Sequence, residues 1–461
     1  MTVTLVVPAP ITATAKRMLR ANVETGAVLG ARIVQTEGGN LRLLAIGIWE
    51  VPQDAYLLQR SDELVVASHG FIPPLAEIEA AGGMAIWVHT HPGDGASPRP
   101  SERDFEVDRR LSEVFRLRTG APFYGALVLS SDGEDIRFAG HIDDGETRTS
   151  IDRLWLVGPE LRLRWHDERP ERPGPGAKYD RQIRAFGAHI QKVVGQLSIA
   201  VVGCGGTGSA VAEQLVRMGA RKLDLYDPDH VSSSNLTRLY GSHPPDIGRA
   251  KTDVVAEHLR SIAPQAQIGT HVSAITTESV ARHLMDADIV FLCTDDNAGR
   301  LVLSRFSTYF LTPVVDVGVL LTSSARGTID GIHGRVTVLH PGGACLVCRG
   351  RVDLQRAAVE LRSSAERASL AAEGYAPAMP GVEPAVVSFT SWVAAVAVSE
   401  LLERLIHYGP RPVPNEILIR AHDREMSTNH AEPRAGHYCS PDGAQWGLGV
   451  TVPFLDQTWT R

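Results

Sequence analysis

The sequence predicts an α/β protein of two domains, an α+β domain followed by a doubly wound domain. Its 461 residues exceed what one hydrophobic core usually serves and fit two domains of ordinary size. Apolar strand-like runs surround one clear helical stretch in the first part, whereas strand and helix patterns alternate after residue 178. Charge, proline and glycine replace this periodicity in between. We therefore predict domains over residues 1–150 and 178–461, joined by a linker over residues 151–177.

Four apolar runs with strand character lie in the N-terminal part, at GAVLGARIV, LRLLAIGIW, GGMAIWVH and FYGALVLS. The stretch SERDFEVDRRLSEVFRL between the third and fourth runs has the apolar spacing of a helix. These patterns predict a compact α+β domain. The stretch WLVGPELRLRWHDERPERPGPGA follows it and contains a run of prolines and glycines from Pro173 to Gly176, which is typical of a linker.

The C-terminal part alternates strands and helices in the order expected of a mainly parallel sheet with helices on both faces. The predicted elements are, in chain order, a strand at LSIAVVG, a helix from Thr207 to Met218, a strand at KLDLYD, a helix from Lys251 to Ile262, and strands at ADIVFLCTD and TPVVDVGV. The uncharged stretch from Pro384 to Ser399 is shorter than the roughly 20 residues that span a bilayer, so we expect a buried helix there.

Composition and charge exclude several classes of function. A formal net charge of −7 gives no general electrostatic reason to bind nucleic acid or an anionic membrane. The N-terminal segment has no basic leader, and two prolines interrupt its apolar run, so it does not predict a signal peptide. Five cysteines, an odd number spread over the chain, do not make a disulfide framework. We expect a cytoplasmic protein that acts on a protein or small-molecule substrate.

The segment HTHPGDGASPRPSERD carries the ligand types of a catalytic metal site. His89 and His91 follow a predicted strand and lie on the same face of it, so both can reach one ion. Asp104 lies in the first turn of the next helix. Two imidazoles and one carboxylate are a common ligand set for catalytic zinc, with the fourth position left for water. A general base is also needed, and Glu24 in ETGAVLG is the candidate.

Each of these residues also has a simpler interpretation. Paired histidines at a strand end are often hydrogen-bonded surface or core residues, and Glu24 has the alternative of an ordinary surface acid. Ser101 and Asp104 fit the SxxD pattern of a helix N-cap with its reciprocal acid. We expect this cap whatever else the two residues do.

Taken together, the Glu of ETGxxLG, HxHP and SxxD resemble the JAMM motif of the JAB/MPN metalloprotease family, which includes deubiquitinases. The resemblance implies a fold like the cytidine deaminase sandwich, with His89, His91 and Asp104 as zinc ligands and Glu24 as the base. It also implies that Ser101 helps to hold the oxyanion of a tetrahedral intermediate. The family usually has fewer residues between HxHP and SxxD, and the loop GDGASPRP would absorb the difference. A metal-free pseudoenzyme is the alternative.

A glycine-rich run, VVGCGGTGSAV, lies between a predicted strand and a predicted helix. Exposed backbone amides and a helix N-terminus can cradle phosphates there. The glycines are Gly203, Gly205, Gly206 and Gly208. Asp227 ends the next strand. This Rossmann-like fingerprint, with Asp227 on ribose hydroxyls, would by itself suggest an NAD-dependent oxidoreductase.

Residues downstream of Asp227 favour a different reaction. The chain continues through DPDHVSSSNLTRLY, DIGRAK and FLCTDDN, which contribute Asn235, Arg238, Lys251 and Asp295. NAD chemistry has no need of these groups at the phosphates. Attack of a carboxylate on an α-phosphate does need them, because cations and magnesium stabilise the negative charge that develops there.

The stretch from Lys178 to about His407 resembles the ThiF/MoeB family and the adenylation domains of ubiquitin-activating enzymes. The resemblance implies contacts with ATP and magnesium as follows: ribose at Asp227, triphosphate at Asn235, Arg238 and Lys251, and Mg2+ at Asp295. Arg181, in KYDRQIRAFG, matches a family arginine that reaches into the nucleotide site of a partner subunit. This match implies a homodimer, whereas the simpler interpretation of Arg181 is a surface salt bridge.

Cys345 and Cys348 form the motif CLVC, which in this family is half of a structural zinc site. The second half is incomplete here, because HYCSPD offers only Cys439, with His437 or Asp442 as a fourth ligand. A zinc site with three cysteines is therefore one interpretation of this pattern.

The remaining cysteines bear on the later steps of the reaction. Thioester-forming members carry a cysteine after the adenylation core, but residues 349–384 contain none. Either the adenylate passes directly to sulfur or another acceptor, or a cysteine of the candidate zinc site is the nucleophile. Cys204 and Cys293 are most simply small buried apolar residues.

The two patterns together predict an enzyme that processes and activates a ubiquitin-like or sulfur-carrier protein ending in glycine. The zinc site would remove C-terminal residues or conjugates, and the second domain would convert the exposed carboxylate to an acyl-adenylate with ATP. The main alternative is formation of a thiocarboxylate on a sulfur carrier rather than protein conjugation. An NAD-dependent oxidoreductase and a binding scaffold with an inactive first domain are the remaining alternatives.

Overall fold

The computed structural model describes residues 1–94, 98–133, 135–166, 177–323, 329–362, 366, 385–443 and 445–459. The chain forms two compact units. Unit 1 comprises Met1–Pro170 with Trp446–Val450, and unit 2 comprises Glu171–Gln445 with Thr451–Arg461. Among the described residues, no helix has the length and apolar character needed to cross a membrane.

Unit 1 is built on a nine-stranded sheet of mixed direction. Its strands are β1 (Val3–Pro8), β2 (Gly26–Gln35), β3 (Leu41–Glu50), β6 (Met84–Asp94), β7 (Tyr124–Asp132), β8 (Asp135–Asp143), β9 (Arg148–Ser150), β10 (Arg153–Val157) and β11 (Leu161–Trp165). They lie in the order β11-β10-β1-β3-β2-β6-β7-β8-β9. β1 pairs in parallel with both β10 and β3. A separate hairpin joins β4 (Tyr56–Gln59) to β5 (Leu64–Val66), and the short 3-10 helices η1 (Gln53–Ala55) and η2 (Ser68–Gly70) flank it.

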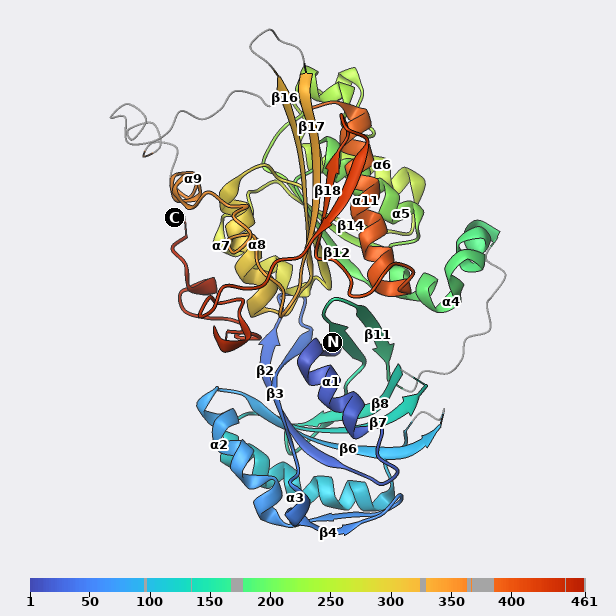
Figure 1. Cartoon of the computed structure of the whole chain (residues 1–461), viewed down its shortest axis with the longest axis vertical. Coiled ribbons are helices and arrows are strands. Elements are labelled where there is room, and N and C mark those ends of the chain that lie inside the picture. Colours follow the sequence, from blue (N-terminus) through green and yellow to red (C-terminus); the bar gives the residue numbers. More distant parts are fainter. Residues whose placement is uncertain are drawn as a thin grey trace. The chain divides into compact units, whose positions relative to one another are not determined.

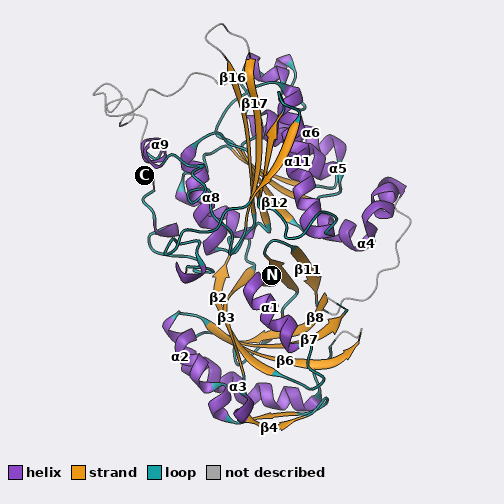
Figure 2. Ribbon diagram, in the orientation of Figure 1, coloured by secondary structure: helices purple, strands orange, loops and turns teal. Residues whose placement is uncertain are grey.

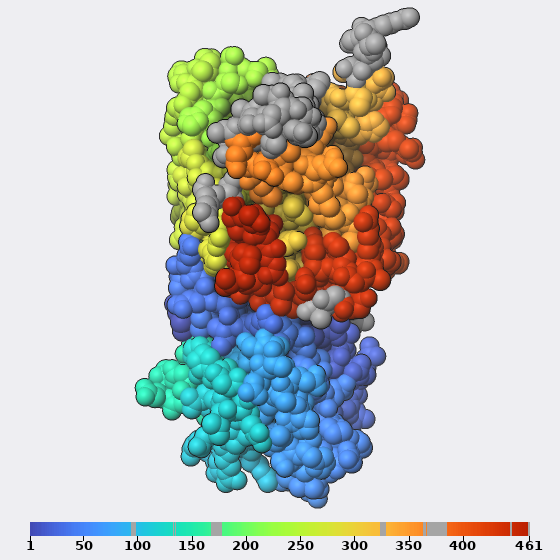
Figure 3. Space-filling model, turned by 90° about the vertical axis from the view of Figure 1, so that its left-hand side faces the viewer, coloured from blue at the N-terminus to red at the C-terminus, as the bar shows by residue number. Residues whose placement is uncertain are grey.

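Helices pack on both faces of this sheet, because successive side chains of a strand point to opposite sides. In β2, Ala27 and Leu29 belong to a buried cluster that includes residues of α1 (Ala9–Met18). Val28, between them, belongs to a second buried cluster with residues of α2 (Ile72–Ala80) and α3 (Glu102–Thr119). Figure 2 shows α1 on one side of the sheet and α2 and α3 on the other. Figure 3 shows the light blue and cyan surface that this second helical layer contributes to unit 1.

The predicted linker over residues 151–177 is wrong in its first half, which forms β10 and β11 of the unit 1 sheet. The leucines of WLVGPELRLRW are buried there. The charges that suggested a linker are neutralised within the sheet, because Arg162 and Arg164 both pair with Asp135 of β8. Residues 167–176, with the run Pro173–Gly176, lie outside the described residues.

Ser101 caps α3 as the SxxD pattern predicted. Its Oγ accepts a hydrogen bond from the Asp104 N–H at 3.2 Å, and the Asp104 carboxylate accepts one from the Ser101 N–H at 2.6 Å. We expect Ser101→Ala to lower the free energy of unfolding of unit 1 by about 1 kcal/mol, because the Asp104 N–H loses its acceptor. Urea unfolding in the presence of EDTA measures this loss. Ser101→Thr keeps the hydroxyl and should cost less, so equal losses in the two variants would contradict the cap.

Unit 2 is built on an eight-stranded sheet. Its strands are β12 (Ser198–Val202), β13 (Lys222–Tyr226), β14 (Gln267–His271), β15 (Ile289–Leu292), β16 (Val314–Ser323), β17 (Ile329–Leu339), β18 (Glu416–Arg420) and β19 (Glu425–Asn429). They lie in the order β14-β13-β12-β15-β16-β17-β18-β19. The strands from β14 to β16 are parallel, and β17, β18 and β19 extend the sheet in antiparallel fashion. The chain leaves β12 toward β13 on one side and reaches β15 on the other, as in doubly wound sheets.

Helices cover both faces of the unit 2 sheet. They are α4 (Asp180–Gln196), α5 (Gly206–Arg217), α6 (Lys251–Ile262), α7 (Glu278–His283), α8 (Asn297–Tyr309), α9 (Leu354–Glu360) and α11 (Val387–Ile406). The 3-10 helices are η3 (Ala177–Tyr179), η4 (Ser233–Thr237), η5 (Pro244–Asp246), η6 (Leu284–Asp286), η7 (Pro441–Gly443) and η8 (Phe454–Asp456). Figure 1 shows α5, α6 and α11 on one side of the sheet and α7, α8 and α9 on the other. The predicted α/β architecture is confirmed. α11 contains most of the helix expected from Pro384 to Ser399 and continues seven residues further, to Ile406.

Candidate functional site

A cavity of about 1610 Å³ opens at the carboxyl ends of β12 and β15 in unit 2. The glycine-rich loop after β12 and the ends of β13 and β15 line one part of it, and β16, β17 and β18 line another. Doubly wound sheets bind ligands at this place, where the strand order reverses. The volume exceeds the roughly 300–1,000 Å³ of typical small-molecule pockets, so it has room for a second substrate beside a nucleotide.

Two glycines of the loop are required by close packing. Gly203 has φ +89°, and a Cβ there would lie 2.8 Å from the carbonyl carbon of Cys293. A Cβ at Gly208, in the first turn of α5, would lie 1.8 Å from the carbonyl oxygen of Gly203. The loop therefore turns tightly against the end of β15. Gly205 and Gly206, which begin α5, line the cavity, where their N–H groups suit phosphate oxygens.

Asp227 follows β13, and two backbone N–H groups hold its carboxylate. It accepts hydrogen bonds from Cys204 N at 2.7 Å and from Asp229 N at 2.8 Å. Burial raises the pKa of Asp227, although the charge of Lys251 opposes this shift. Lys251, the first residue of α6, places its Nζ 2.7 Å from Oδ2 of Asp229 and 3.9 Å from Oδ1 of Asp227. A buried carboxylate and an ammonium group therefore lie side by side, as the predicted contacts with ribose and phosphate require.

Asn235 and Arg238 come from η4 and the residue after it. Asn235 Oδ1 accepts a hydrogen bond from Ser232 N at 3.0 Å, which fixes the start of this short helix. Arg238 Nη1 donates to the carbonyl oxygen of Ser234 at 2.8 Å. The aliphatic part of Arg238 lies against Gly206, where an added Cβ would approach Cγ and Cδ to 3.1 Å. The guanidinium group therefore lies beside the glycine-rich loop.

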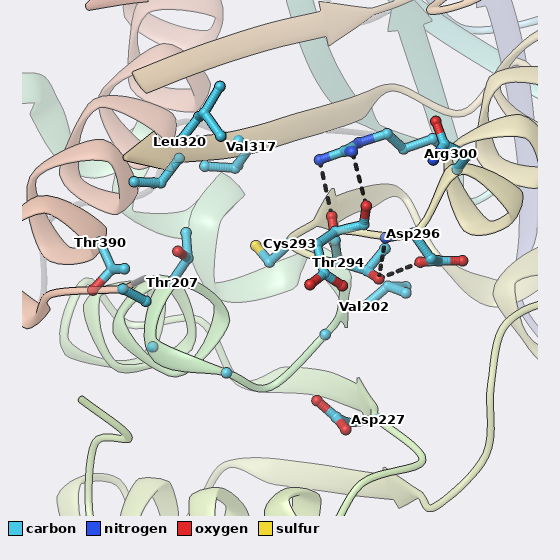
Figure 4. A pocket seen from close by; sticks show the side chains of 18 of the residues that line it. Val202, Thr207, Asp227, Cys293, Thr294, Asp296, Arg300, Val317, Leu320 and Thr390 are labelled. Atoms are coloured by element: carbon cyan, nitrogen blue, oxygen red, sulfur yellow. Dashed lines mark hydrogen bonds between the residues drawn. The ribbon is translucent and has the colours of Figure 1, made fainter. Parts of the chain in front are cut away.

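Asp295 lies in the cavity wall, in the loop between β15 and α8. Asp296 caps α8 by accepting a hydrogen bond from Gly299 N at 2.6 Å. Arg300, one turn into α8, donates to the carbonyl oxygens of Thr294 at 3.0 Å and Asp295 at 3.2 Å (Figure 4). Contacts with α8 therefore hold the backbone of this loop, and the Asp295 carboxylate is of the ligand type that Mg2+ prefers.

Most of the predicted nucleotide-site residues lie together in this cavity. They are Gly203, Gly205, Gly206, Asp227, Asn235, Arg238, Lys251 and Asp295. Gly208 is not among the described residues that line the cavity, because it packs behind the loop against Gly203. Arg181 is exposed on α4 and does not line the described cavity of its own chain. The role predicted for Arg181, a contact with the nucleotide site of a partner subunit, stays a prediction.

A buried ionic network that the sequence did not predict lies next to this cavity. Asp316 of β16 is fully buried and pairs with Arg300 Nε at 3.1 Å and with Arg335 Nη2 at 2.6 Å. Both arginines line the cavity. The signal that points to the network is a single aspartate inside the otherwise apolar strand run TPVVDVGV.

A second cluster of polar side chains lies in unit 1, on β6 and at the start of α3. The Nε2 atoms of His89 and His91 are 3.2 Å apart. Asp104 places Oδ1 3.3 Å from Nε2 of His89 and Oδ2 3.7 Å from Nε2 of His91. The ligand atoms of the three residues all lie within 4.8 Å of one another. Ligands bound to one tetrahedral zinc ion at about 2.0–2.2 Å lie roughly 3.3–3.6 Å apart, so this donor set fits zinc.

Glu24 lies beside this cluster, with Oε1 3.6 Å from Nε2 of His91. The end of the β4–β5 hairpin holds its backbone, because Glu24 N donates to the Arg60 carbonyl oxygen at 2.8 Å and Gln59 Nε2 donates to the Glu24 carbonyl oxygen at 3.0 Å. Burial raises the pKa of Glu24 to about 7. The position and protonation equilibrium of Glu24 both suit a general base.

Ser101 and Asp104 are directly linked at the edge of the cluster. Ser101 Oγ donates to Asp104 Oδ2 at 2.8 Å. Burial opposes ionisation of Asp104, but the hydrogen bonds and charge of His89 and the hydrogen bonds of Ser101 together hold its pKa below the usual range. The carboxylate is therefore ready to act as a ligand. Residues 95–97 of the loop GDGASPRP, which was expected to absorb extra length, lie outside the described residues.

A third cluster in unit 2 has the donor set of a structural zinc site. It consists of Cys345, Cys348, His437 and Cys439, whose ligand atoms all lie within 4.8 Å of one another. His437 Nδ1 is 3.3 Å from the sulfur atoms of Cys348 and Cys439. Three thiolates and one imidazole suit a closed tetrahedral site.

We expect His437→Ala to reduce the zinc content by about one equivalent per chain and to lower the Tm of unit 2 by about 5–10 °C, because a structural metal stabilises the fold that presents its ligands. Elemental analysis and calorimetry measure the two effects. Asp442→Ala is the matched control, because Asp442 bonds to Ser440 and to the Gly436 N–H instead. Zinc loss in the Asp442 variant alone would show that the carboxylate is the fourth ligand.

The fold and the cavity define an α/β protein with a candidate nucleotide site, in which a glycine-rich loop, a carboxylate after β13 and several cations meet where the strand order reverses. The chain belongs to the ThiF family, whose model matches residues 179–440, more than half of the chain.

The curated relatives are similar over part of their length. The ubiquitin-like modifier-activating enzyme 5 of Xenopus laevis is 31% identical over 164 residues, which cover 33% of this chain and 39% of that protein. The enzyme of the same name from Oryza sativa subsp. japonica is 32% identical over 165 residues, covering 33% and 37%. The chain thus spans about two fifths of the curated relatives it matches.

Solved structures give a weaker similarity. MccB of E. coli matches with a TM-score of 0.45 and 17% sequence identity, over 57% of this chain and 72% of that chain.

Proposed function

We propose that unit 2 uses ATP and Mg2+ to adenylate the C-terminal glycine carboxylate of a ubiquitin-like or sulfur-carrier protein. The observation that carries this proposal is the convergence of Asp227, Arg238, Lys251 and Asp295 on one cavity in a member of the ThiF family. The similarity to ubiquitin-like modifier-activating enzymes supports a protein carboxylate as the second substrate. The size of the cavity supports a site for two substrates.

In the proposed step, a carboxylate oxygen of the partner's terminal glycine attacks the α-phosphorus of ATP, and the bond to the β-phosphate breaks to release pyrophosphate. The N–H groups of the glycine-rich loop would bind phosphate oxygens, and Asp227 would accept hydrogen bonds from ribose hydroxyls. Arg238 and Lys251 would stabilise the charge that develops on the phosphates. Mg2+ held by Asp295 would supply further positive charge there.

The acceptor of the acyl-adenylate defines two versions of this proposal. Protein conjugation through a thioester needs a cysteine, and residues 349–384 provide none. Formation of a thiocarboxylate on a sulfur carrier needs no such cysteine, so it is the main alternative. An NAD-dependent oxidoreductase is the remote alternative, because it gives no role to Arg238, Lys251 or Asp295.

A homodimer is part of the proposal. Arg181 is exposed near the start of α4, on a segment set off from the rest of the helix by non-helical backbone at Gly187 (φ 85°, ψ 158°). Figure 1 shows this end of α4 standing away from the rest of unit 2. An exposed arginine on a projecting helix suits a contact with the nucleotide site of a second chain.

We further propose that unit 1 is a zinc-dependent peptidase or isopeptidase of the JAB/MPN type. The approach of the ligand atoms of His89, His91 and Asp104 to within 4.8 Å supports it, as does the Glu24 carboxylate beside them. A zinc ion bound there would polarise the scissile carbonyl and acidify water. Glu24 would take a proton from the attacking water and pass it to the leaving amine. Ser101 would donate a hydrogen bond to the developing oxyanion.

The two activities would act on one class of partner. The zinc site would remove residues that follow the terminal glycine, or release the partner from conjugates, and unit 2 would activate the carboxylate so exposed. Joining both sites in one chain raises the effective concentration of the partner at the second site. A scaffold with an inactive unit 1 is the alternative, and it would bind no zinc at His89 and His91.

ATP–pyrophosphate exchange with a ubiquitin-like protein tests the whole proposal. The protein is supplied once truncated after its terminal glycine and once with a C-terminal extension. We expect the truncated form to support exchange with both the wild type and Glu24→Ala, and the extended form to support it only when Glu24 is present. If no protein with a terminal glycine stimulates exchange, the domain acts on another carboxylate and the proposal fails.

A further inference from the structure

A buried carboxylate lies behind the wall of the cavity, and the proposed reaction does not use it. Asp316 is the third residue of β16, and its side-chain exposure is 0%. Placing a carboxylate in the interior is unfavourable unless it is paired and hydrogen-bonded. Arg300 and Arg335 provide that pairing from α8 and β17, one on each oxygen of Asp316. An apolar residue could occupy this buried strand position without any ion-pair partner. Packing alone therefore does not explain why a carboxylate is present here.

Arg300 connects this carboxylate to the loop that carries Asp295. Its Nε donates to Asp316 Oδ1 at 3.1 Å, while Nη1 and Nη2 donate to the carbonyl oxygens of Asp295 and Thr294 at 3.2 Å and 3.0 Å. Figure 4 shows these last two bonds at the edge of the cavity. All three nitrogens of one planar guanidinium group are in use, so its orientation is fixed. Burial lowers the pKa of Arg300, but the neighbouring carboxylates of Asp316, Asp296 and Asp295 together raise it above its usual value.

Arg335 holds the same carboxylate from the neighbouring strand. Its Nη2 lies 2.6 Å from Asp316 Oδ2, and its side chain is 18% exposed. Asp316 is thus held against both α8 and β17, and it cannot turn away from Arg300 without losing a buried ion pair. The network therefore connects the paired strands β16 and β17 to the carbonyl groups of Thr294 and Asp295, and it restricts the movement of these two groups.

We propose that Asp316 is a positioning residue of the adenylation site, which acts through Arg300 to hold the Asp295 loop in the geometry that Mg2+ requires. Arg335 holds Asp316 in place beside Arg300 through its bond to the second carboxylate oxygen. The inference rests on the proposed function of unit 2. The groups expected to bind the nucleotide itself, such as Asp227 and Lys251, have no hydrogen bond to this network among the described contacts. Loss of Asp316 should therefore weaken the binding of Mg2+ at the site and spare metal-free nucleotide binding.

Equilibrium binding of a fluorescent ATP analogue to the full chain, across a range of Mg2+ concentrations, tests the proposal. We expect Asp316→Asn and Arg300→Gln to raise the Mg2+ concentration at half-maximal enhancement roughly tenfold or more, as for other residues that orient metal ligands. Affinity without Mg2+ should stay within about twofold of the wild type. Arg335→Gln leaves Asp316 and Arg300 in place and should shift the Mg2+ midpoint in the same direction. This variant tests the proposal if Asp316→Asn does not fold.

Arg305→Gln is the matched control. Arg305 also lies on α8 and also donates to two backbone carbonyl oxygens, those of Leu455 at 2.8 Å and Asp456 at 2.6 Å, but it does not line the described cavity. It should lower the Tm and leave the Mg2+ midpoint unchanged. If the Asp316 and Arg335 variants behave like this control, their role is structural only and the inference is overturned.

Asp295→Asn separates failure of the inference from failure of the proposed function. If Asp295→Asn abolishes the Mg2+ effect while the network variants leave it unchanged, only the positioning role fails. If Asp295→Asn has no effect on Mg2+ dependence either, the proposed metal site itself fails, and the positioning role fails with it.

Discussion

Asp295→Asn should lower the rate of ATP–pyrophosphate exchange by at least about 100-fold, which is the scale of losing one preorganised electrostatic group at a reacting phosphate. The substitution removes the negative charge but keeps the size of the side chain. Because Arg300 and the cap of α8 hold the backbone of this loop, the loop itself should not move. Incorporation of labelled pyrophosphate into ATP, with the partner protein present, measures the loss.

Asp296→Asn is the control for this prediction. Asp296 is the adjacent carboxylate in the same loop, but it caps α8, and asparagine is an equally good N-cap residue. We expect this variant to retain exchange within a few-fold of the wild type. Equal losses at the two positions would mean that the charge of the loop, and not the Asp295 ligand, supports the reaction.

His91→Ala should remove one equivalent of zinc per chain and abolish peptide-bond cleavage by unit 1. His91 is one of only three protein ligands in the proposed site, so its loss leaves an incomplete donor set. Elemental analysis measures the metal, and mass spectrometry of a ubiquitin-like protein with a C-terminal extension measures cleavage. Zinc at the cysteine cluster should remain, because His437 and the cysteines belong to a separate cluster.

Glu24→Gln separates metal binding from proton transfer in the same site. Glutamine keeps the shape of the side chain, and the backbone contacts of residue 24 with Arg60 and Gln59 do not depend on its charge. We expect full zinc content with a rate of cleavage lowered about 100- to 10,000-fold, the range typical of a lost general base. A cleavage rate equal to the wild type would assign the base to another residue.

Local features of the fold were readable from the sequence. α6 has the bounds predicted for it, Lys251–Ile262, because its apolar spacing and its flanking residues are all contained in one short segment. The cap formed by Ser101 and Asp104 is likewise a contact over three positions, and a three-residue pattern is enough to predict it.

Features that depend on distant partners were not readable. β1 and β10 pair with each other although they lie near opposite ends of the unit 1 sequence. The residue pattern of either segment alone does not show which strand will be its neighbour. The charges of Arg162 and Arg164 suggested an exposed linker, because nothing in their own segment shows that Asp135 will neutralise them. Long-range ion pairs can turn a polar stretch into a strand of a sheet.

The same distinction holds for the sites. The glycine-rich loop and the histidine pair are compact motifs, and the structure brings their residues together. His437, and not Asp442, lies beside the three cysteines. This position depends on the path of the chain after β19, which no local pattern specifies. Asp316 was overlooked for a similar reason, since its two partners lie on different elements.

The place of β1 in the sheet affects how unit 1 can fold during synthesis. The Val3 N–H donates to the Asp152 carboxylate, 149 positions later in the chain, and β10 follows directly. At about 5–20 residues per second, a ribosome needs roughly 7–30 s to make the intervening chain. During that interval β1 can pair with β3 only, and its other edge stays open to unintended partners. The nascent chain would therefore benefit from a chaperone until β10 has emerged.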